Sequence, residues 1–370
     1  MYLQTLDILN FRNHKKSSLN FSSGINLIIG KNGQGKTNLL EAIYVLFNGK
    51  SYKSSLNNVL ITLGEETTVV KGSLVGEEKK EDIGVMLKIN EQKNIKINGM
   101  QNQRVKDLRN IVNIVLFSPE DLKIVKGGPG GRRDFIDEVG EQINYKYNHL
   151  KWKFLRILKQ RNNLLRQVIG KRWKKEELEL WDDKLVLVGS KFIGARNEVV
   201  EKLKPYCHKI NLKINSKKNL KINYLNNLLN NGDVEGEFYR KIKELKNYEI
   251  ERGNTLVGPH RDDVGLYLNG VDVRLYGSQG EQRVVSLCLK MAELELIKEE
   301  KKKTPILLMD DVMSELDEEM RDNLLSFILN LKQSIITTTN LSYFNQEYMD
   351  RINLIEVYGG SVKERMCLKT

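Results

Sequence analysis

A chain of 370 residues is too long for one ordinary hydrophobic core, so its length favours about two domains. Its composition, 40% hydrophobic and 29% charged, is typical of a globular protein and excludes a disordered one. The formal net charge of +12 favours an acidic partner, whereas no apolar run approaches the ~18 residues of a membrane span and no leader opens the chain. We therefore expect a cytoplasmic protein without a membrane partner.

The first motif is GKNGQGKT at residues 30–37, between an apolar strand expected over 25–29 and an amphipathic helix. In its form, G-x-x-x-x-G-K-T, small residues let backbone N–H groups close around the phosphates of a nucleotide. Lys36 neutralises the β- and γ-phosphate oxygens, and the Thr37 hydroxyl ligates Mg²⁺. The cofactor-binding residues predicted here are Gly30, Lys31, Asn32, Gly33, Gln34, Gly35, Lys36, Thr37 and Asn38.

The middle of the chain is strongly basic. Residues 142–175 contain eleven Lys or Arg and no acid, and residues 202–232 contain seven and again no acid. Such clustering favours a surface for a polyanion, although the solvated face of a Lys-rich protein is the simpler alternative. The residues expected at a DNA surface are Arg132 and Arg133 at a helix start, then Lys151, Lys153, Arg156 and Lys159.

The same region carries two heptad patterns, which predict an antiparallel helical hairpin of about 40 Å. The stripes are core positions, Gly170 separates the two helices, and Pro205 ends the second helix. The first stripe is Ile143, Tyr147, Leu150, Phe154, Ile157, Leu164 and Val168, with Arg161 polar; the second is Leu178, Trp181, Leu185, Val188, Phe192, Ala195 and Val199.

The segment LYGSQGEQRVVSL, residues 275–287, predicts a tight turn followed by a helix. Backbone N–H groups at such a helix start attract an anion, so Ser278, Gly280 and Glu281 are candidate phosphate contacts. Alternatively, Ser278 is an ordinary N-cap and Glu281 completes a capping box.

A second apolar strand, expected over 306–309, ends in two carboxylates, Asp310 and Asp311. Ligands bind at the carboxyl ends of strands in open parallel sheets. We therefore expect Asp310 to hold the Mg²⁺ ion and Asp311 to act as the general base that polarises the attacking water. A further strand over 334–340 gives the β-α-β alternation of a parallel sheet. A pair of solvent-facing acids is the alternative reading.

Three cysteines, Cys207, Cys288 and Cys367, are far apart in the sequence. Their spacing matches neither a zinc site nor a disulfide framework. We expect them to be unreactive thiols.

The order of these motifs resembles that of ATP-binding-cassette proteins. By this resemblance, Ser278 lies in a signature turn that contacts the phosphate of a nucleotide held by a second subunit, and residues 314–317, SELD, cross between subunits. Two ATP molecules would then lie in a head-to-tail dimer. Glu281 replaces a glutamine of the signature, Gln279 replaces a glycine, and Thr338 and Thr339 stand where a histidine is usual, so hydrolysis should be slow.

Five blocks in order, covering the whole chain, resemble the RecF family of SMC-like ATPases. The resemblance implies an α/β P-loop ATPase head split across both chain ends, residues 1–125 with 255–370, and an inserted helical, basic domain at 126–254. It also implies an ATP-gated clamp on double-stranded DNA near gaps, which acts with RecO and RecR to load RecA. The blocks are residues 6–44, 116–137, 256–264, 276–283 and 307–317.

By the same resemblance, Lys36, Asp310, Asp311 and Ser278 form the catalytic set, with ATP and Mg²⁺ as cofactors. The N-terminal block implies that Arg12 and Asn13 lie near the nucleotide. In the loop at residues 49–55, Tyr52 and Lys53 depart from the family's Ser-His-Arg pattern.

Three other functions fit parts of the sequence. The ATP-binding subunit of a transporter would not need the basic runs or the hairpin. A P-loop kinase or GTPase acting on a small substrate would leave the signature turn unexplained. A nuclease would need a second acidic cluster, for which His260, Asp262 and Asp263 are the candidates.

Overall fold

The computed structural model describes residues 1–77, 79–101, 103–168, 175–214, 218–228, 232–344 and 349–365. The chain divides into two compact units, one formed by residues 1–121 with 297–370 and the other by residues 122–296. The first unit therefore joins both ends of the chain around the nucleotide motifs. Its first junction lies close to the expected residue 125.

The second junction differs from the boundary expected at residue 255. Strand β9 (Asp263–Leu268) pairs antiparallel with β8 (Leu220–Leu225) along its whole length, so the segment after residue 255 stays with the inserted unit. Strand β10 (Val271–Asp272) completes this small sheet. A pairing between strands about 40 residues apart leaves no boundary signal in composition.

A mainly parallel sheet places the nucleotide motifs in the first unit. Its strand order is β14–β13–β3–β12–β11–β7, with β14 antiparallel to β13 and the other neighbours parallel. The carboxyl ends of parallel strands meet at one edge, so the loop after β3 and the acids after β11 converge. The bounds are β3 (Gly24–Ile29), β7 (Ile114–Phe117), β11 (Ile306–Asp310), β12 (Gln333–Thr338), β13 (Ile352–Tyr358) and β14 (Ser361–Arg365).

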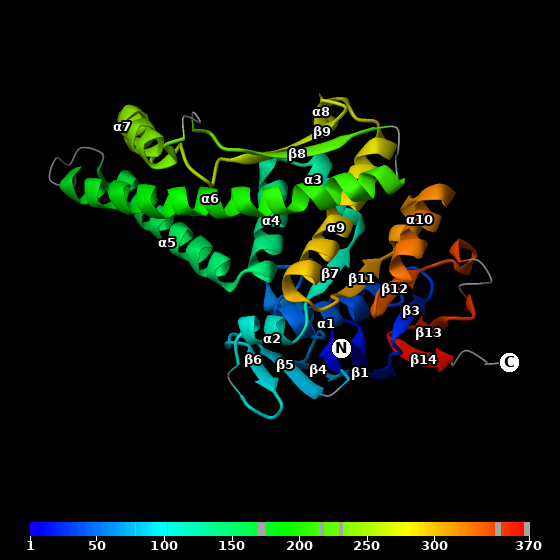
Figure 1. Cartoon of the computed structure of the whole chain (residues 1–370). Coiled ribbons are helices and arrows are strands. Elements are labelled where there is room, and N and C mark those ends of the chain that lie inside the picture. The colour runs from blue at the N-terminus through cyan, green and yellow to red at the C-terminus, as the bar shows by residue number, and fades with distance from the viewer. Residues whose placement is uncertain are drawn as a thin grey trace. The chain divides into compact units, whose positions relative to one another are not determined.

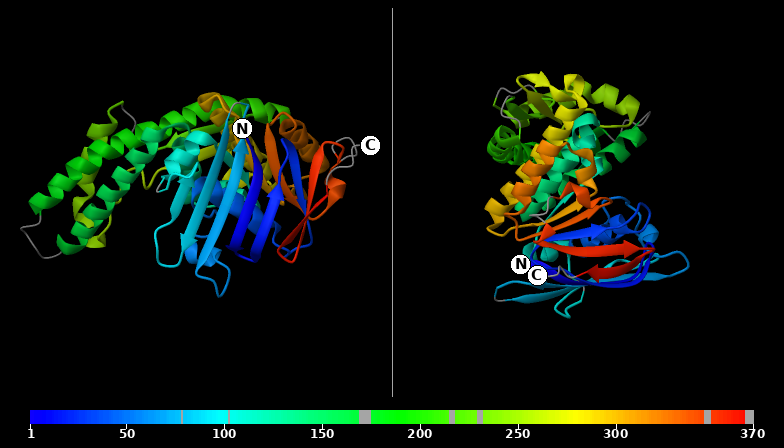
Figure 2. Two further views of the ribbon diagram at one scale, coloured as in Figure 1. Left: turned by 90° about the horizontal axis from the view of Figure 1, so that it is seen from below. Right: turned by 90° about the vertical axis from the view of Figure 1, so that its right-hand side faces the viewer.

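Helix α1 (Lys36–Asn48) is buried around most of its circumference. Its apolar side chains share one core with residues of the parallel sheet and of a second, antiparallel sheet of order β2–β1–β4–β5–β6, seen in blue and cyan in Figure 2. Burial on all sides fixes the helix and so the phosphate loop at its start. The bounds are β1 (Tyr2–Phe11), β2 (His14–Asn20), β4 (Thr67–Val75), β5 (Lys80–Lys88), β6 (Asn94–Ile97), α2 (Val105–Ile111) and α10 (Glu318–Ile328).

The second unit is mainly helical, and the long helices α5 and α6 pack against each other in it (Figure 1). These elements confirm the α/β class with a helical insertion. No helix in the described ranges combines the length and apolarity that a bilayer crossing requires. The bounds are α3 (Leu122–Lys126), α4 (Pro129–Ile143), α5 (Tyr145–Val168), α6 (Lys175–Ile214), α7 (Val234–Arg252), α8 (Val273–Tyr276) and α9 (Gln279–Lys301).

Most positions of the heptad stripes are buried, as predicted, whereas Leu150, Trp181 and Ala195 are half-buried and Ile143 lies at the end of α4. On α5, Tyr147, Phe154, Ile157 and Leu164 are buried, and on α6 the buried positions include Leu178, Leu185, Val188, Phe192 and Val199. Gly170 and the side chain of Val168 lie outside the described residues. With 24 residues α5 is about 36 Å long, close to the expected hairpin length.

The expectation that Pro205 ends the second helix is wrong, because Pro205 lies inside the 40-residue helix α6. An internal proline costs about 3 kcal/mol. Beyond it, however, Cys207, Ile210 and Ile214 are buried, and each such side chain contributes about 1.5–3 kcal/mol. Packing against β8 therefore outweighs the local penalty and continues the helix.

The two cysteines that the structure describes are free and buried. Burial raises the pKa of the Cys288 thiol to about 12, and that of Cys207 rises for the same reason. Both thiols are thus protonated at neutral pH and poor nucleophiles. Cys367 lies outside the described residues.

A buried polar network holds the hairpin helices to the segment that follows them. Arg161, fully buried on α5, donates to Asp182 at 2.7 Å, to Glu249 at 2.6 Å and to the Thr255 hydroxyl at 2.7 Å. One guanidinium thus neutralises two buried carboxylates from α6 and α7. This explains the single polar position in an otherwise apolar stripe.

Replacing Arg161 with Leu should destabilise the protein by about 3–5 kcal/mol, because two buried carboxylates lose their counter-charge. Urea unfolding followed by circular dichroism measures the change. Arg156→Leu, on the exposed face of the same helix, is the matched control and should cost less than about 0.5 kcal/mol. Equal stability of the two variants would contradict the structural role of the network.

Candidate nucleotide-binding site

The loop between β3 and α1 has the backbone of a phosphate cradle. Gly33 and Gly35 have φ angles of 79° and 109°, a region that side chains other than glycine rarely adopt. A Cβ atom on Gly30 would lie 2.4 Å from the carbonyl oxygen of Val357. Glycine is therefore required at these positions by backbone conformation or by space, as the motif predicts.

Lys36 lies folded over this loop. Its Nζ atom donates to the carbonyl oxygens of Gly30 at 2.7 Å and Lys31 at 3.1 Å. Burial lowers the pKa of the Lys36 ammonium, while the carboxylates of Asp311 and Asp310 oppose that shift. A cation held at the loop by carbonyl groups is available to bind phosphate oxygens.

A hydrogen bond joins the start of α1, directly after the phosphate loop, to the end of strand β11. The Thr37 hydroxyl donates to Asp310 Oδ1 at 2.7 Å, and the Thr337 hydroxyl donates to the same oxygen at 3.1 Å. A hydroxyl and a carboxylate are the oxygen ligands that Mg²⁺ accepts while keeping several waters. Thr37 and Asp310 therefore fit a magnesium site, and bound Mg²⁺ would neutralise phosphate charge there.

The other oxygen of Asp310 is held by the loop at residues 49–55. Tyr52 donates its hydroxyl to Asp310 Oδ2 at 3.0 Å, and Lys53 Nζ lies 3.6 Å from the same atom. Sequence reasoning noted these two residues only as departures from a family pattern. No local signal links them to Asp310, since the contact spans more than 250 residues.

Asp311 has a geometry distinct from that of Asp310. Its backbone is left-handed, with φ of 52°, and its N–H donates to the carbonyl of Thr337 at 3.2 Å and to that residue's hydroxyl at 3.0 Å. None of the described residues hydrogen-bonds its buried Oδ1 atom. Burial raises the pKa of Asp311, an effect that Lys36 opposes. A carboxylate oxygen of this kind can accept a proton from water.

Arg12 and Asn13 lie beside the phosphate loop in different ways. Arg12 pairs through both arms with the buried Glu41 of α1, at 2.9 and 3.0 Å, so it supports the helix that bears the loop. Asn13 contacts the loop region itself, donating to the carbonyl of Gln34 at 3.3 Å and accepting from Asn38 at 2.8 Å.

His14, which sequence reasoning did not select, is fully buried behind the loop. Its Nε2 atom donates to the carbonyl of Gly35 at 3.1 Å, and its Nδ1 atom lies 3.1 Å from the Ser17 hydroxyl. A single histidine in a basic stretch gives no sequence signal for such a contact.

The turn at Ser278 belongs to the second unit and opens helix α9. Glu281 accepts from the backbone N–H of Ser278 at 2.7 Å, and its own N–H donates to the Ser278 hydroxyl at 3.3 Å, which is a complete capping box. A Cβ atom on Gly280 would meet nothing within 4 Å. The capping alternative is thus present in the geometry, and it leaves the turn exposed with its Ser278 backbone fixed.

The segment after Asp311 is ordered by short local bonds. The Ser314 hydroxyl donates to the carbonyl of Asp311 at 2.8 Å, and Asp317 caps α10 by accepting from Met320 at 2.9 Å. In the stretch where cassette proteins usually have a histidine, Thr338 is buried and its hydroxyl donates to the carbonyl of Asn340 at 3.1 Å.

The expected DNA residues separate into two groups. Arg132 is 2% exposed and bonds to Asp263 at 2.7 and 3.0 Å and to three carbonyl groups, so its guanidinium is consumed within the second unit. Partly buried Arg133 donates to the carbonyl of Asp262 at 2.7 Å, and Lys151 pairs with Asp137 and Glu141. In contrast, the side chains of Lys153, Arg156 and Lys159 are exposed on α5.

The three candidates for a second metal cluster have structural partners instead. Asp263 pairs with Arg132, Asp262 accepts from the Tyr224 hydroxyl, and His260 Nε2 lies 3.0 Å from the Thr255 carbonyl. Burial lowers the pKa of His260 to about 4. Among the described residues, no group of three acidic, histidine or cysteine side chains could hold a metal ion.

Comparison with known proteins shows which family this chain belongs to. The family model described as RecF/RecN/SMC N terminal domain matches residues 2–361. The DNA replication and repair protein RecF of Halothermothrix orenii is 38% identical, with 98% of each chain covered. The chain belongs to the RecF family. The RecF of Lachnoclostridium phytofermentans is 37% identical over 98% of this chain and 100% of that protein.

Solved structures agree with the RecF assignment. The recombination mediator RecF with the ATP analogue ATPrS, described as part of the RecFOR pathway, superposes with a TM-score of 0.89 at 35% identity, covering 98% of each chain. The Smc head domain of Pyrococcus furiosus shares the fold, with a TM-score of 0.54 at 16% identity over 98% and 96% of the chains. Recognition, fold class and ATPase family predicted from the motifs are thereby confirmed.

Replacing Lys36 with Met should weaken ATP binding about 100-fold or more, because the phosphate oxygens lose their main counter-charge. The melting temperature should stay within about 2 °C, because the substitution also removes a desolvated ammonium. Calorimetric titration with ATP and thermal unfolding measure the two effects. Lys71→Met is the matched control, since the Lys71 side chain is exposed on β4 away from the phosphate loop, and it should bind ATP nearly as wild type.

Proposed function

We propose that this RecF-family protein is an ATP-dependent DNA clamp. ATP and Mg²⁺ bind at Lys36, Thr37 and Asp310, two chains then associate head to tail, and the dimer holds double-stranded DNA near gaps. With RecO and RecR it promotes RecA loading, and slow, DNA-stimulated hydrolysis releases it. The observation that carries the proposal is the 2.7 Å hydrogen bond between Thr37 and Asp310, which unites both halves of a cassette-type nucleotide site.

The proposed dimer uses two phosphate-binding elements that belong to different units of the chain. The cradle around Lys36 lies in the first unit and the turn at Ser278 in the second. A head-to-tail pair with two-fold symmetry brings the turn of one chain to the nucleotide of the other, which makes each site a product of both subunits. Backbone N–H groups at the start of α9 would then face the γ-phosphate.

The hydrolysis step needs a base near the γ-phosphate. Asp311 is suited to this role, because a carboxylate with a raised pKa takes a proton from water more readily than an ordinary one. Water attacks the γ-phosphorus, the bond to the β-phosphate oxygen breaks, and the proton passes to Asp311. Thr338 and Thr339 supply no imidazole, which is consistent with slow turnover.

The DNA surface follows the exposed face of α5. Lys153, Arg156 and Lys159 are exposed there, and Trp152, 65% exposed, lies beside them. Contacts from such side chains to phosphate groups position DNA without reading its sequence. Arg132 is left out of this surface because its guanidinium is buried and fully bonded.

Light scattering with and without a slowly hydrolysed ATP analogue tests the dimer. We expect the wild-type mass to double only with the nucleotide, and Ser278→Arg to remain monomeric because its side chain fills the phosphate position. Ser18→Arg, at an exposed serine of β2, is the matched control and should dimerise. A wild-type protein that binds the analogue yet stays monomeric would instead favour a P-loop enzyme acting on a small substrate.

Reversal of two charges tests the DNA surface. Lys153→Glu with Arg156→Glu should lower affinity for a gapped duplex at least about tenfold and reduce the salt slope by about two, one unit per lost phosphate contact. Fluorescence anisotropy over a salt series gives both values. The matched control, Lys15→Glu with Lys16→Glu on exposed positions of β2, makes the same charge change. If both double variants lose the same affinity for the gapped duplex, DNA binding depends only on the net charge of the protein.

A further inference from the structure

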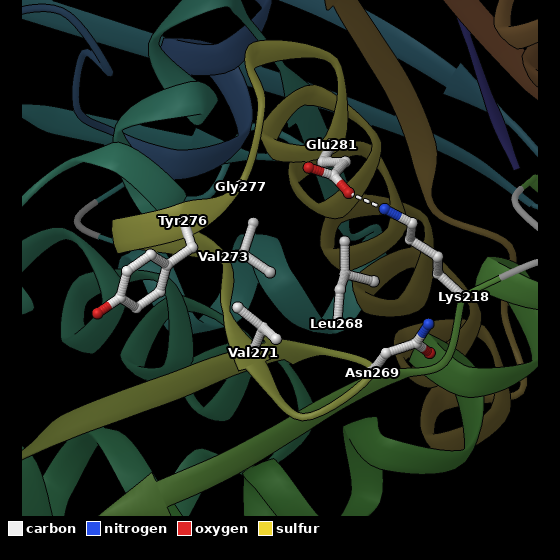
Figure 3. A pocket seen from close by; sticks show the side chains of 8 residues that line it. All are labelled: Lys218, Leu268, Asn269, Val271, Val273, Tyr276, Gly277 and Glu281. Atoms are coloured by element: carbon white, nitrogen blue, oxygen red, sulfur yellow. Dashed lines mark hydrogen bonds and ion pairs between the residues drawn. The ribbon is translucent and has the colours of Figure 1, made fainter.

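A lysine side chain, Lys218, pairs with an acid in the turn that opens α9. Lys218, at the start of the segment leading into β8, forms an ion pair with Glu281, and the two side chains face each other across one side of a cavity of about 300 Å³ (Figure 3). We propose that Lys218 is a positioning residue for the signature turn, which it keeps receptive to a nucleotide phosphate by neutralising Glu281. This inference rests on the proposed role of Ser278 in the partner's nucleotide site.

Glu281 presents an electrostatic problem for that role. One of its oxygens caps the Ser278 N–H at 2.7 Å, so its charge lies within one helical turn of the expected phosphate. The hydrogen bonds from Lys218 and from Ser278 hold the pKa of Glu281 down to about 2. The carboxylate therefore remains charged at neutral pH, and neutralisation has to come from a counter-ion.

Lys218 is held in place to supply this counter-ion. The side chain of the buried Asn211, on α6, donates to the carbonyl of Lys218. The next residue, Asn219, exchanges hydrogen bonds with Asn269 beside the paired strands β8 and β9, at 2.8 and 3.0 Å. These contacts fix the backbone at Lys218 and at the residue after it, and from this position the Lys218 side chain reaches Glu281.

The pairing also explains a departure from the cassette signature. A glutamine at position 281 would cap Ser278 as well as a glutamate does, because either completes a capping box. The glutamate adds a charge that a phosphate would oppose, and the lysine removes that conflict. The ion pair links the turn to the end of α6, the longer helix of the basic hairpin.

A double-mutant cycle tests the proposal, with the concentration for half-maximal dimerisation as the readout in saturating ATP analogue. Lys218→Met should weaken dimerisation about tenfold, because an uncompensated carboxylate then faces the incoming phosphate. Glu281→Gln should dimerise as well as wild type, since the cap persists. The double variant should return to within about twofold of wild type. Lys221→Met, which removes an exposed charge from the same strand, is the matched control and should have no effect.

Two results would overturn the proposal. If Lys218→Met dimerises at the same concentration as wild type, Glu281 needs no counter-ion. If the double variant dimerises as weakly as Lys218→Met, Lys218 acts on something other than Glu281. In either case the loss of dimer in Ser278→Arg would leave the proposed function intact. If wild type itself stays monomeric with the analogue bound, the proposed function and this inference fail together. Circular dichroism of each variant confirms that it is folded.

Discussion

The hydrogen bond between Thr37 and Asp310 is the contact on which the rest of the site depends. It joins residues 273 positions apart and exists only because β12 lies between β3 and β11 in the parallel sheet. The register of the parallel sheet fixes where β3 and β11 end relative to each other, and burial of α1 between two sheets fixes the phosphate loop at its start. Both constraints come from the fold itself, so Thr37 and Asp310, the candidate magnesium ligands, are preorganised.

Three carboxylates near the phosphate-binding elements are each held by protein partners. Asp310 is held by Thr37, Tyr52 and Lys53, Glu41 by Arg12, and Glu281 by Lys218. Such pairing keeps acidic side chains ordered close to a highly charged anion. Asp311 differs, since none of the described residues bonds its Oδ1 atom, and this sets it apart as the candidate base.

The sequence predicts those parts of the structure that local pattern determines. The phosphate loop, the acids after β11 and the buried stripes of α5 and α6 follow from glycine spacing, apolar strands and heptads, and the structure has them at those positions. Features set by distant contacts were missed. Tyr52 and His14 contact Asp310 and Gly35, which are distant in the sequence. Packing after Pro205 outweighs the local signal for a helix end.

Charge is the pattern that sequence reasoning interprets least reliably here. Arg132 and Lys153 look alike in a basic stretch, yet one is buried against Asp263 and the other is exposed. The burial of an arginine depends on whether folding brings it a carboxylate, and Asp263 lies 131 residues from Arg132. The sequence therefore indicates a basic region, whereas the structure shows which of its basic side chains are exposed.

The central claim is that each nucleotide site is completed by a second chain, and mixing two inactive variants tests it most directly. Lys36→Met lacks the cradle and Ser278→Arg lacks the turn, so each alone should hydrolyse almost no ATP. Ser278→Arg alone stays monomeric because none of its sites is complete, but in the mixture its intact cradle can meet the intact turn of Lys36→Met. We predict that the mixture has a DNA-stimulated ATPase rate several-fold above the sum of the separate rates. A rate equal to that sum would contradict a shared site.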